Sequence, residues 1–204
     1  MDVTVCVATF GGPEWEHLAR SRALPSARAL GVPAVHVHAG TLHEARNLAV
    51  AEVDTEWVIH LDADDELEPG YVTAMAAGSA DVRAPAVRYI RGYGDRSAAA
   101  AMPRVAGHDH DCTGGCLPYG NWLVVGAAVR TELVRAVGGW QDWDWSEDWD
   151  LWLRIFLAGG SFEAVPAAVY RAHVRRGSRN RGRSHAARLA THRAIAEANG
   201  VPVP

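Results

Sequence analysis

The chain has 204 residues, of which 49% are apolar and 22% are charged, a balance typical of a soluble globular protein with one domain of ordinary size. No apolar stretch approaches the roughly 18 residues that cross a bilayer, and no basic segment precedes the apolar N-terminal residues, so we expect a cytoplasmic protein without a transmembrane segment. The three cysteines, Cys6, Cys112 and Cys116, are an odd number and do not suit a disulfide-rich scaffold.

The formal charge of −4 hides an uneven distribution of basic residues. All 20 of them are arginine, and the segment 171–193 holds a run of arginines and no acidic residue. Because the planar guanidinium fork binds two phosphate oxygens at once, this segment predicts contact with an anion. Three interpretations stay open: a lid over substrate phosphates, a track along a nucleic-acid backbone, or a merely solvated tail. The arginines are Arg171, Arg175, Arg176, Arg179, Arg181, Arg183, Arg188 and Arg193.

The first part of the chain alternates strand and helix patterns. Valines at every second position begin a strand that ends at Thr9 and Phe10, and Pro13 stands where a helix can start. The alternation of strand, helix, strand, helix, strand predicts parallel pairing with helices on the faces of the sheet. In order, the predicted elements are a strand at 3–10, a helix at 13–30, a strand at 34–38, a helix at 42–53 and a strand at 57–61.

The second part is less regular. The stretch 92–120 has no period and predicts a long loop of the functional or mobile kind. Ser146 is a candidate cap for a helix whose apolar positions, beginning with Trp149 and Trp152, fall on one face. The other predicted elements are a short helix from Pro69, a strand at 81–91, a strand at 121–130, a short helix at 132–137, a strand at 162–170 and a helix at 186–198.

A cluster of carboxylates follows the strand at 57–61. Strand alternation would place Asp62 and Asp64 on one side, where two carboxylates can converge on a hard cation, Mg²⁺ or Mn²⁺, that grips phosphate oxygens. Parallel sheets bind ligands beyond the carboxyl ends of their strands, and Thr9, Phe10 and Asp62 all stand at such ends. The alternative is an acidic turn that caps the helix after it.

Several motifs together resemble glycosyltransferase family 2. The strand that ends in Asp62-Ala63-Asp64-Asp65 follows an Ala-Arg-Asn segment at 45–47, and Gly-Gly-Trp at 138–140 and Glu-Asp-Trp-Asp-Leu-Trp-Leu-Arg at 147–154 come later. The resemblance extends from residue 3 to about residue 173. It implies an α/β chain with the GT-A fold, a Rossmann-like three-layer sandwich around a mostly parallel central sheet.

The resemblance also implies roles for individual residues. Asp62 and Asp64 would hold the metal, and Asp148 would be the general base of an inverting sugar transfer. A histidine that sometimes completes the metal shell would be His173. The expected substrate-binding residues are Thr9, Phe10, Arg46, Asn47, Asp62, Asp65, Trp143, Trp145 and Glu147.

The position of Asp148 in the first turn of a helix agrees with a base that must be ionised, since the helix dipole favours the charged carboxylate there. Acidic residues are also common in the first turn of any helix. Trp143 and Trp145 lie in the loop before it and predict an acceptor platform, with simple cover of the sheet edge as the alternative. Relatives often read the nucleobase with an aspartate after the second strand, and this chain has His36 and His38 in that region instead.

A second group of possible metal ligands lies in the long loop. His108, His110, Cys112 and Cys116 are zinc-type ligands at close spacing, but the spacing matches no zinc finger we can name. We therefore favour a mobile acceptor loop in which these residues are incidental.

The predicted function is metal-dependent, inverting transfer of a sugar from a nucleotide-diphosphate sugar to a hydroxyl acceptor, which is a glycan, a lipid carrier, a protein, a metabolite or modified DNA. The predicted domain spans 1–174, with a nucleotide-binding half at 1–91 and an acceptor-binding half at 92–174, followed by an Arg-rich loop and helix at 175–204. The alternatives are a nucleotidyltransferase and a non-catalytic carbohydrate or nucleic-acid binder; the segment 9–17 carries too little positive charge to favour the first.

Overall fold

The fold is known from a computed structural model that describes residues 1–91, 99–100, 117–174 and 184–202. One mixed sheet has the strand order β2-β1-β3-β7-β5-β8-β4, with β6 paired to β5. Its strands are β1 (Val3–Phe10), β2 (Ala34–Ala39), β3 (Trp57–Asp62), β4 (Glu66–Leu67), β5 (Val82–Arg91), β6 (Ala99–Ala100), β7 (Ala128–Arg130) and β8 (Phe162–Val174).

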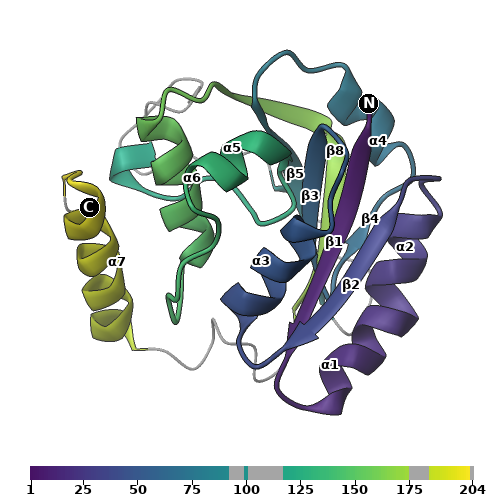
Figure 1. The fold of residues 1–204 in the computed structure, drawn as a ribbon, viewed down its shortest axis with the longest axis horizontal. Coiled ribbons are helices and arrows are strands. Elements are labelled where there is room, and N and C mark those ends of the chain that lie inside the picture. The colour runs from purple at the N-terminus through teal and green to yellow at the C-terminus, as the bar shows by residue number, and fades with distance from the viewer. Residues whose placement is uncertain (92–98, 101–116, 175–183, 203–204) are drawn as a thin grey trace.

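Helices cover the sheet on both sides, as the predicted α/β class requires (Figure 1). The helices α1 and α2 lie on one side of β1 and β2, and α3, α5 and α6 lie on the other. The helices are α1 (Pro13–Leu18), α2 (Leu24–Arg28), α3 (Leu42–Ala51), α4 (Tyr71–Ala76), α5 (Thr131–Ala136), α6 (Glu147–Leu157) and α7 (His185–Asn199), and a π-helical turn, Ala19–Ala23, joins α1 to α2.

Parallel pairing in the first part of the chain is confirmed, since β1 pairs with both β2 and β3 in parallel. The strands β5 and β8 form another parallel pair, whereas β7, β4 and β6 each pair antiparallel with their neighbours. Because β1 and β3 run side by side, Thr9, Phe10 and Asp62 end at the same edge of the sheet. That edge holds the candidate site.

Local sequence explains why α3 begins where it does. Thr41 accepts a hydrogen bond from the backbone N–H of Glu44, and the Glu44 carboxylate accepts one from the backbone N–H of Thr41. This reciprocal capping box satisfies two N–H groups that the first helical turn leaves unpaired. It fixes the start of the helix that carries Arg46.

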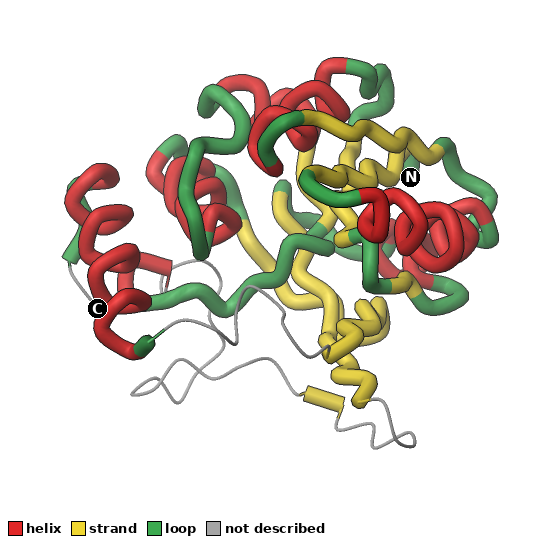
Figure 2. The backbone as a smooth tube through the Cα atoms, turned by 90° about the horizontal axis from the view of Figure 1, so that it is seen from below, coloured by secondary structure: helices red, strands yellow, loops and turns green. Residues whose placement is uncertain are grey.

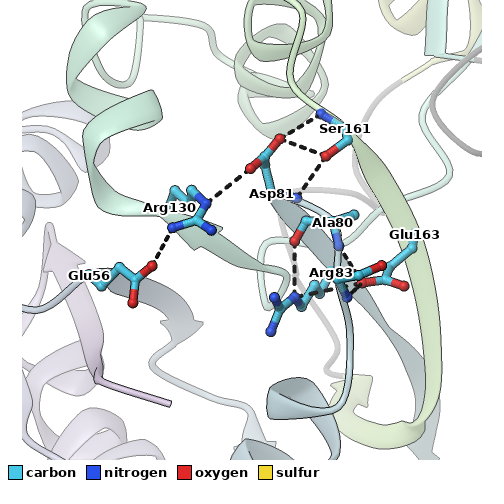
Figure 3. Close-up of polar contacts among 8 residues, drawn as sticks. Glu56, Ala80, Asp81, Arg83, Arg130, Ser161 and Glu163 are labelled. Atoms are coloured by element: carbon cyan, nitrogen blue, oxygen red, sulfur yellow. Dashed lines mark hydrogen bonds and ion pairs between the residues drawn. The ribbon is translucent and has the colours of Figure 1, made fainter.

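The opposite end of the sheet is held by charged and polar pairs from segments far apart in the chain (Figure 3). The Arg130 guanidinium joins Glu56, just before β3, to Asp81, just before β5. Asp81 also accepts hydrogen bonds from the backbone and hydroxyl of Ser161, just before β8. Arg83 lies 3.6 Å from Glu163. At this end of the sheet, side-chain contacts therefore join the segments that precede β3, β5 and β8.

The predicted strand at 121–130 is largely wrong, because only Ala128–Arg130 forms a strand. The preceding residues fold as a turn, with a hydrogen bond from Ala127 N–H to Val124 O, and Gly126 packs against Tyr170. A Cβ at residue 126 would stand 2.2 Å from the Tyr170 ring, so only glycine permits this approach. The stretch predicted as a loop at 92–120 contains β6 and a 3₁₀ turn, Leu117–Tyr119, and residues 92–98 and 101–116 lie outside the described part of the chain.

The C-terminal helix α7 lies beside α6, at the side of the molecule away from the N-terminus (Figures 1 and 2). Its Ile195 and Ala196 are buried, and Asn199 donates a hydrogen bond to Asp150 of α6. None of the described helices combines the length and apolar character that a membrane span requires.

Candidate active site

Asp62 is the last residue of β3, and a tight turn follows it. The backbone N–H of Asp65 donates to the Asp62 carbonyl at 3.0 Å, and this turn brings both Asp62 and Asp64 to one cavity of about 330 Å³. Thr9 and Phe10 at the end of β1 line the same cavity. The structure therefore brings together four residues that the sequence predicted for the nucleotide side of the site. The cavity is lined by Ala8, Thr9, Phe10, Trp15, Leu42, Asp62, Ala63, Asp64, Asp65, Tyr89, Ala172, His173 and Val174.

Asp65 fastens the turn to β8. Its carboxylate accepts a hydrogen bond from the Tyr170 hydroxyl at 2.8 Å and another from the backbone N–H of His173 at 2.7 Å. The Tyr170 hydroxyl in turn accepts the backbone N–H of Asp62 at 3.3 Å. Burial, with the nearby Asp62 and Asp64 charges, raises the pKa of Asp65 well above its usual range. Asp65 lines the cavity, but its oxygens are used to hold the turn in place.

Arg46 connects the two groups of acidic residues. From α3, its guanidinium donates to Asp62 at 3.0 Å and to Glu147, the first residue of α6, at 2.9 Å. Its Cζ atom also lies 4.2 Å from the centroid of the Trp140 ring, over the ring face. Burial alone would lower the pKa of Arg46, but the carboxylates of Glu147, Asp62 and Asp148 outweigh burial and raise it, so the charge is held.

Asp148, the predicted base, follows Glu147 in the first turn of α6. Its carboxylate accepts hydrogen bonds from the Asn121 amide at 3.0 Å and from the backbone N–H of Trp149 at 2.9 Å. Burial and the neighbouring Glu147 charge raise the pKa of Asp148 to about 6, against the opposing effects of Asn121 and Arg46. A carboxylate with this pKa is ionised at neutral pH and is more basic than an ordinary aspartate.

Asn47, which the sequence predicts to bind substrate, is hydrogen-bonded to the backbone of Trp140. Its amide donates to the Trp140 carbonyl at 2.9 Å and accepts the Trp140 N–H at 2.8 Å, which uses both ends of the side chain. It lines neither of the two cavities described here. Asn47 therefore fastens the Gly-Gly-Trp turn to α3, and Gly139 must be glycine because a Cβ there would lie 2.3 Å from the Asn47 oxygen.

At the end of β1, Thr9 lies between two histidines of β2. Its hydroxyl is 3.0 Å from His36 Nε2 and 3.1 Å from His38 Nδ1. Burial and the nearby Arg20 charge lower the pKa of His36. The Thr9 hydroxyl is therefore occupied by its own neighbours, although the residue lines the cavity as predicted.

His173 also lines the cavity, but its ring is paired. Its Nε2 lies 2.6 Å from a carboxylate oxygen of Glu66. Burial lowers the pKa of His173, which Glu66 partly offsets. Within the described part of the chain, no group of three or more His, Cys, Asp or Glu residues is arranged to hold a metal ion. Metal binding by His173 stays a prediction, and the ligand set His108, His110, Cys112 and Cys116 lies outside the described residues.

The two tryptophans predicted to form an acceptor platform are in different surroundings. Trp143 lines a second cavity of about 160 Å³ together with Thr41, His43 and Glu147. Trp145 instead stacks on His192 of α7, with ring centroids 4.7 Å apart and planes 20° from parallel. The two cavities share Phe10 and Leu42 as lining residues, so they adjoin. Of these two tryptophans, only Trp143 lines one of the two cavities described here.

Sequence reasoning missed three residues that shape the site. Tyr170 fixes the aspartate turn, Asn121 holds Asp148, and His192 contacts the loop before α6. Their partners are 27 or more positions away in the chain, so no local spacing reveals them. The proposed cap at Ser146 is also corrected: Ser146 precedes α6, but its side chain makes no capping bond and contacts His192.

Solved structures of similar fold include several of TarS of S. aureus. The structure of TarS 1–349 in complex with UDP-GlcNAc matches 96% of this chain and 65% of its own length, with a TM-score of 0.64 and 15% identity. TarS 1–349 in complex with UDP matches with a TM-score of 0.61 and 14% identity, over 98% of this chain and 65% of that one. A longer TarS structure matches with 16% identity and a TM-score of 0.61, over 96% of this chain and 39% of that one. This chain therefore spans about two thirds of TarS 1–349.

These similarities confirm the predicted GT-A type of fold. Comparison with curated protein sequences finds no match. The model of the family described as glycosyl transferase family group 2 matches residues 57–186, which is most of the chain. The match begins with β3 and includes the aspartate turn, the Gly-Gly-Trp turn and all of α6. The chain therefore belongs to glycosyl transferase family group 2.

Proposed function

We propose that this chain transfers a sugar from a nucleoside-diphosphate sugar to a hydroxyl acceptor, with inversion at the sugar carbon and with a divalent metal ion. The observation that carries the proposal is the Arg46 bridge. It ties the carboxylate that faces the large cavity, Asp62, to Glu147, which stands next to the candidate base. A transferase needs a donor site and a base on opposite sides of one reacting carbon, and this arrangement supports both.

The donor is assigned to the larger cavity. It lies at the carboxyl ends of β1 and β3, the usual place for a ligand in a parallel sheet. Its lining combines aromatic and apolar side chains, such as Phe10, Trp15 and Tyr89, with the acidic turn at one side. Such a lining suits a flat base and ribose together with a charged diphosphate. TarS, which shares the fold, has been crystallised with UDP-GlcNAc and with UDP, so these are the first ligands to test.

The acidic turn fits a magnesium or manganese ion. Asp62 and Asp64 both line the cavity, and the Asp62 side chain stays 44% exposed although it pairs with Arg46. Mg²⁺ is commonly bound by one or two carboxylates, with substrate phosphates and waters as its other ligands. When bound, the ion would supply positive charge to the departing diphosphate. Asp62 and Asp64 would hold it, and Asp65 with Tyr170 would keep the turn in position.

The acceptor is assigned to the smaller cavity, where Trp143 offers a flat apolar face next to Glu147. Asp148 lines neither cavity itself, but it directly follows Glu147, which lines the smaller one. In the proposed transfer, the Asp148 carboxylate takes the proton of the acceptor hydroxyl. The acceptor oxygen then forms a bond to the anomeric carbon as the bond from that carbon to the phosphate oxygen breaks. The electron pair of that bond leaves with the nucleoside diphosphate, and attack from the opposite face inverts the configuration.

The test uses the purified chain, Mn²⁺ and a panel of nucleotide sugars that includes UDP-GlcNAc. We expect binding that raises the unfolding temperature, needs Mn²⁺ and is lost in Asp64→Asn. We expect Asp148→Asn to bind the donor as the wild type does but to lower kcat by about 10²- to 10⁴-fold. The product should have the opposite anomeric configuration to the donor by NMR.

The matched control is Asp54→Asn, since Asp54 is an exposed aspartate before β3, at the other end of the strand from the site. This variant should bind and turn over the donor normally. Donor binding that survives Asp64→Asn without Mn²⁺ would instead identify a binder that needs no metal. Undiminished turnover in Asp148→Asn would remove that residue from the role of base.

A further inference from the structure

The helix α7 contacts the residues that precede the candidate base, in a part of the chain that the family model does not cover. The family match ends at residue 186, and α7 begins at His185, so nearly all of this helix lies beyond the matched region. It packs against α6, whose first turn holds Glu147 and Asp148. The structural match to TarS 1–349 in complex with UDP covers 98% of this chain, so most of α7 lies within the shared fold although the family model ends before it.

The residue before α6 has an unusual backbone. Ser146 has φ 56° and ψ 29°, and it is the only residue other than glycine with positive φ among those that the structure describes. The left-handed region is unfavourable for a residue with a Cβ, and it persists where surrounding contacts impose it. Because Ser146 makes no capping bond of its own, those contacts must come from elsewhere.

Two side chains of α7 contact this turn: Arg188, whose Cζ lies 5.6 Å from the centroid of the Trp145 ring, and His192, which also reaches Ser146. The Nε2 atom of His192 lies 3.1 Å from the Ser146 hydroxyl, and its ring stacks on Trp145, the residue before Ser146. The same ring lies 4.8 Å from Trp149, which follows in the first turns of α6. One imidazole therefore contacts residues on both sides of the turn. Burial lowers the pKa of His192, so the ring is neutral at pH 7 and adds no charge beside the acids.

The turn at Ser146 decides where the next two side chains point. Glu147 is directed to Arg46 at 2.9 Å, and Asp148 is directed to Asn121 at 3.0 Å. A change of backbone conformation at residue 146 would rotate the start of α6 and displace both carboxylates. A catalytic group that moves by an ångström loses much of its effect.

We infer that His192 is a positioning residue, which holds the left-handed turn at Ser146 and so places Asp148 for proton abstraction. The role given to Asp148 rests on the function proposed above; the role of His192 in holding the turn does not. His192 touches no cavity-lining residue of the donor site, so its loss should leave donor binding intact.

The helix α7 also contacts α6 at a second place, and a substitution there provides a matched control. The Asn199 amide donates to Asp150 at 3.0 Å, and it contacts neither Ser146 nor Trp145. Asn199→Ala weakens the docking of α7 without touching the turn. His192→Ala removes the imidazole contacts to Ser146, Trp145 and Trp149, and leaves the Arg188 contact with Trp145 and the Asp150 attachment in place.

The first measurement is amide hydrogen exchange, followed by mass spectrometry, on the segment 143–150. We expect exchange in this segment to rise at least several-fold in His192→Ala and to stay near the wild-type rate in Asn199→Ala. We expect kcat to fall by about 10- to 100-fold in His192→Ala, the scale of a misplaced catalytic group. The dissociation constant for UDP with Mn²⁺ should be unchanged in both variants.

A double-mutant cycle isolates the backbone effect. Glycine adopts positive φ without steric cost, so Ser146→Gly should need less support from His192. The loss of kcat caused by His192→Ala should therefore be smaller in the Ser146→Gly background. If His192→Ala does not fold, two milder variants replace it. His192→Phe keeps an aromatic ring against Trp145, and His192→Gln keeps a polar partner for Ser146. A partial loss of kcat in each variant would support the same role for His192.

Equal exchange rates and equal kcat in His192→Ala and Asn199→Ala would overturn the inference, as would a wild-type rate in His192→Ala. If the wild type turns over no nucleotide sugar, the proposed function fails. The exchange experiment then still decides whether His192 holds the turn, since it depends on no substrate.

Discussion

The Asp148 carboxylate is set apart from the other acidic residues of the site by its surroundings. Burial and Glu147 raise its pKa to about 6, whereas the Asn121 amide and Arg46 act in the other direction. A raised pKa makes the carboxylate a better proton acceptor, provided the pH stays above that value. The site thus gains basicity without becoming protonated at neutral pH.

This predicts the pH dependence of the reaction. The base works only when ionised, so kcat/KM should fall about tenfold per pH unit below pH 6 and level off above it. Asn121→Ala removes a hydrogen bond that favours the charged form, so the falling limb should move to higher pH. Initial rates between pH 4.5 and 8 at low donor concentration test both expectations, using ~0.5-unit steps. If the fall of kcat/KM at low pH stays at the same pH in Asn121→Ala, the titrating group is not Asp148.

For individual residues, the sequence shows well which residue types lie near the site but shows poorly where their side chains point. Asp62 and Asp64 could be found because a strand period and a sharp polar end are local patterns. The orientations of Asn47 and Trp145 could not, since their partners Trp140 and His192 are brought near by the fold alone. A side chain near a site in sequence can still be used for packing.

Among the elements, the Gly-Gly-Trp turn shows how a short connection can position a helix. Both of its glycines have positive φ, and Gly139 lies so close to Asn47 that a Cβ would collide with the amide oxygen. The two hydrogen bonds between Asn47 and the Trp140 backbone then join the turn to α3. Trp140 also donates from its indole to His60 of β3 at 3.2 Å. One turn thus connects α3, β3 and the approach to α6.

The loss of unfolding free energy caused by a side chain at residue 139 can be compared with the loss at a matched glycine. Gly31 has nearly the same φ, 72° against 70°, but nothing lies within 4 Å of a Cβ there. Gly31→Ala should cost about 1 kcal/mol of unfolding free energy from backbone strain alone. Gly139→Ala should cost roughly 2–4 kcal/mol, because it adds the displacement of Asn47. Urea unfolding of both variants at pH 7 gives the comparison, and equal losses would show that Asn47 moves aside freely.

Elements with a clear period were predicted close to their observed bounds. The α3 and α6 helices have amphipathic patterns, the β1 and β2 strands are rich in valine and alanine, and α3 also has a capping box at its start. The stretch 121–127 has the composition of a strand but is folded by Asn121 and Gly126 into a turn against Tyr170 and Asp148. Tertiary contacts override local preference there.

Across the whole molecule, Arg46 links the two parts of the chain that the sequence divides into nucleotide and acceptor halves. Its contact with Glu147 spans 101 positions, and both side chains are nearly inaccessible, at 4% and 9% exposure. Such a pair need not make the protein more stable than apolar side chains in the same positions would. Removing only one partner, however, leaves the other as an unpaired buried charge.

We therefore expect Arg46→Ala to lower the unfolding free energy by roughly 3–5 kcal/mol. The control is Arg20→Ala, which removes an exposed pair with Glu16 one turn away in the same helical segment and should cost at most about 0.5 kcal/mol. Urea denaturation at pH 7 measures both. A loss in Arg46→Ala no larger than that in Arg20→Ala would mean that Glu147 becomes solvated or protonated without difficulty.

The hydroxyl of Tyr170 that secures the aspartate turn has a consequence for how the protein matures. Every acid of that turn is synthesised before residue 70, but the phenol that fixes its backbone comes a hundred positions later. A nascent or truncated polypeptide that stops short of β8 would carry the complete set of carboxylates in an unsecured peptide. The aspartate turn can therefore take its final conformation only after β8 has been synthesised and has joined the sheet.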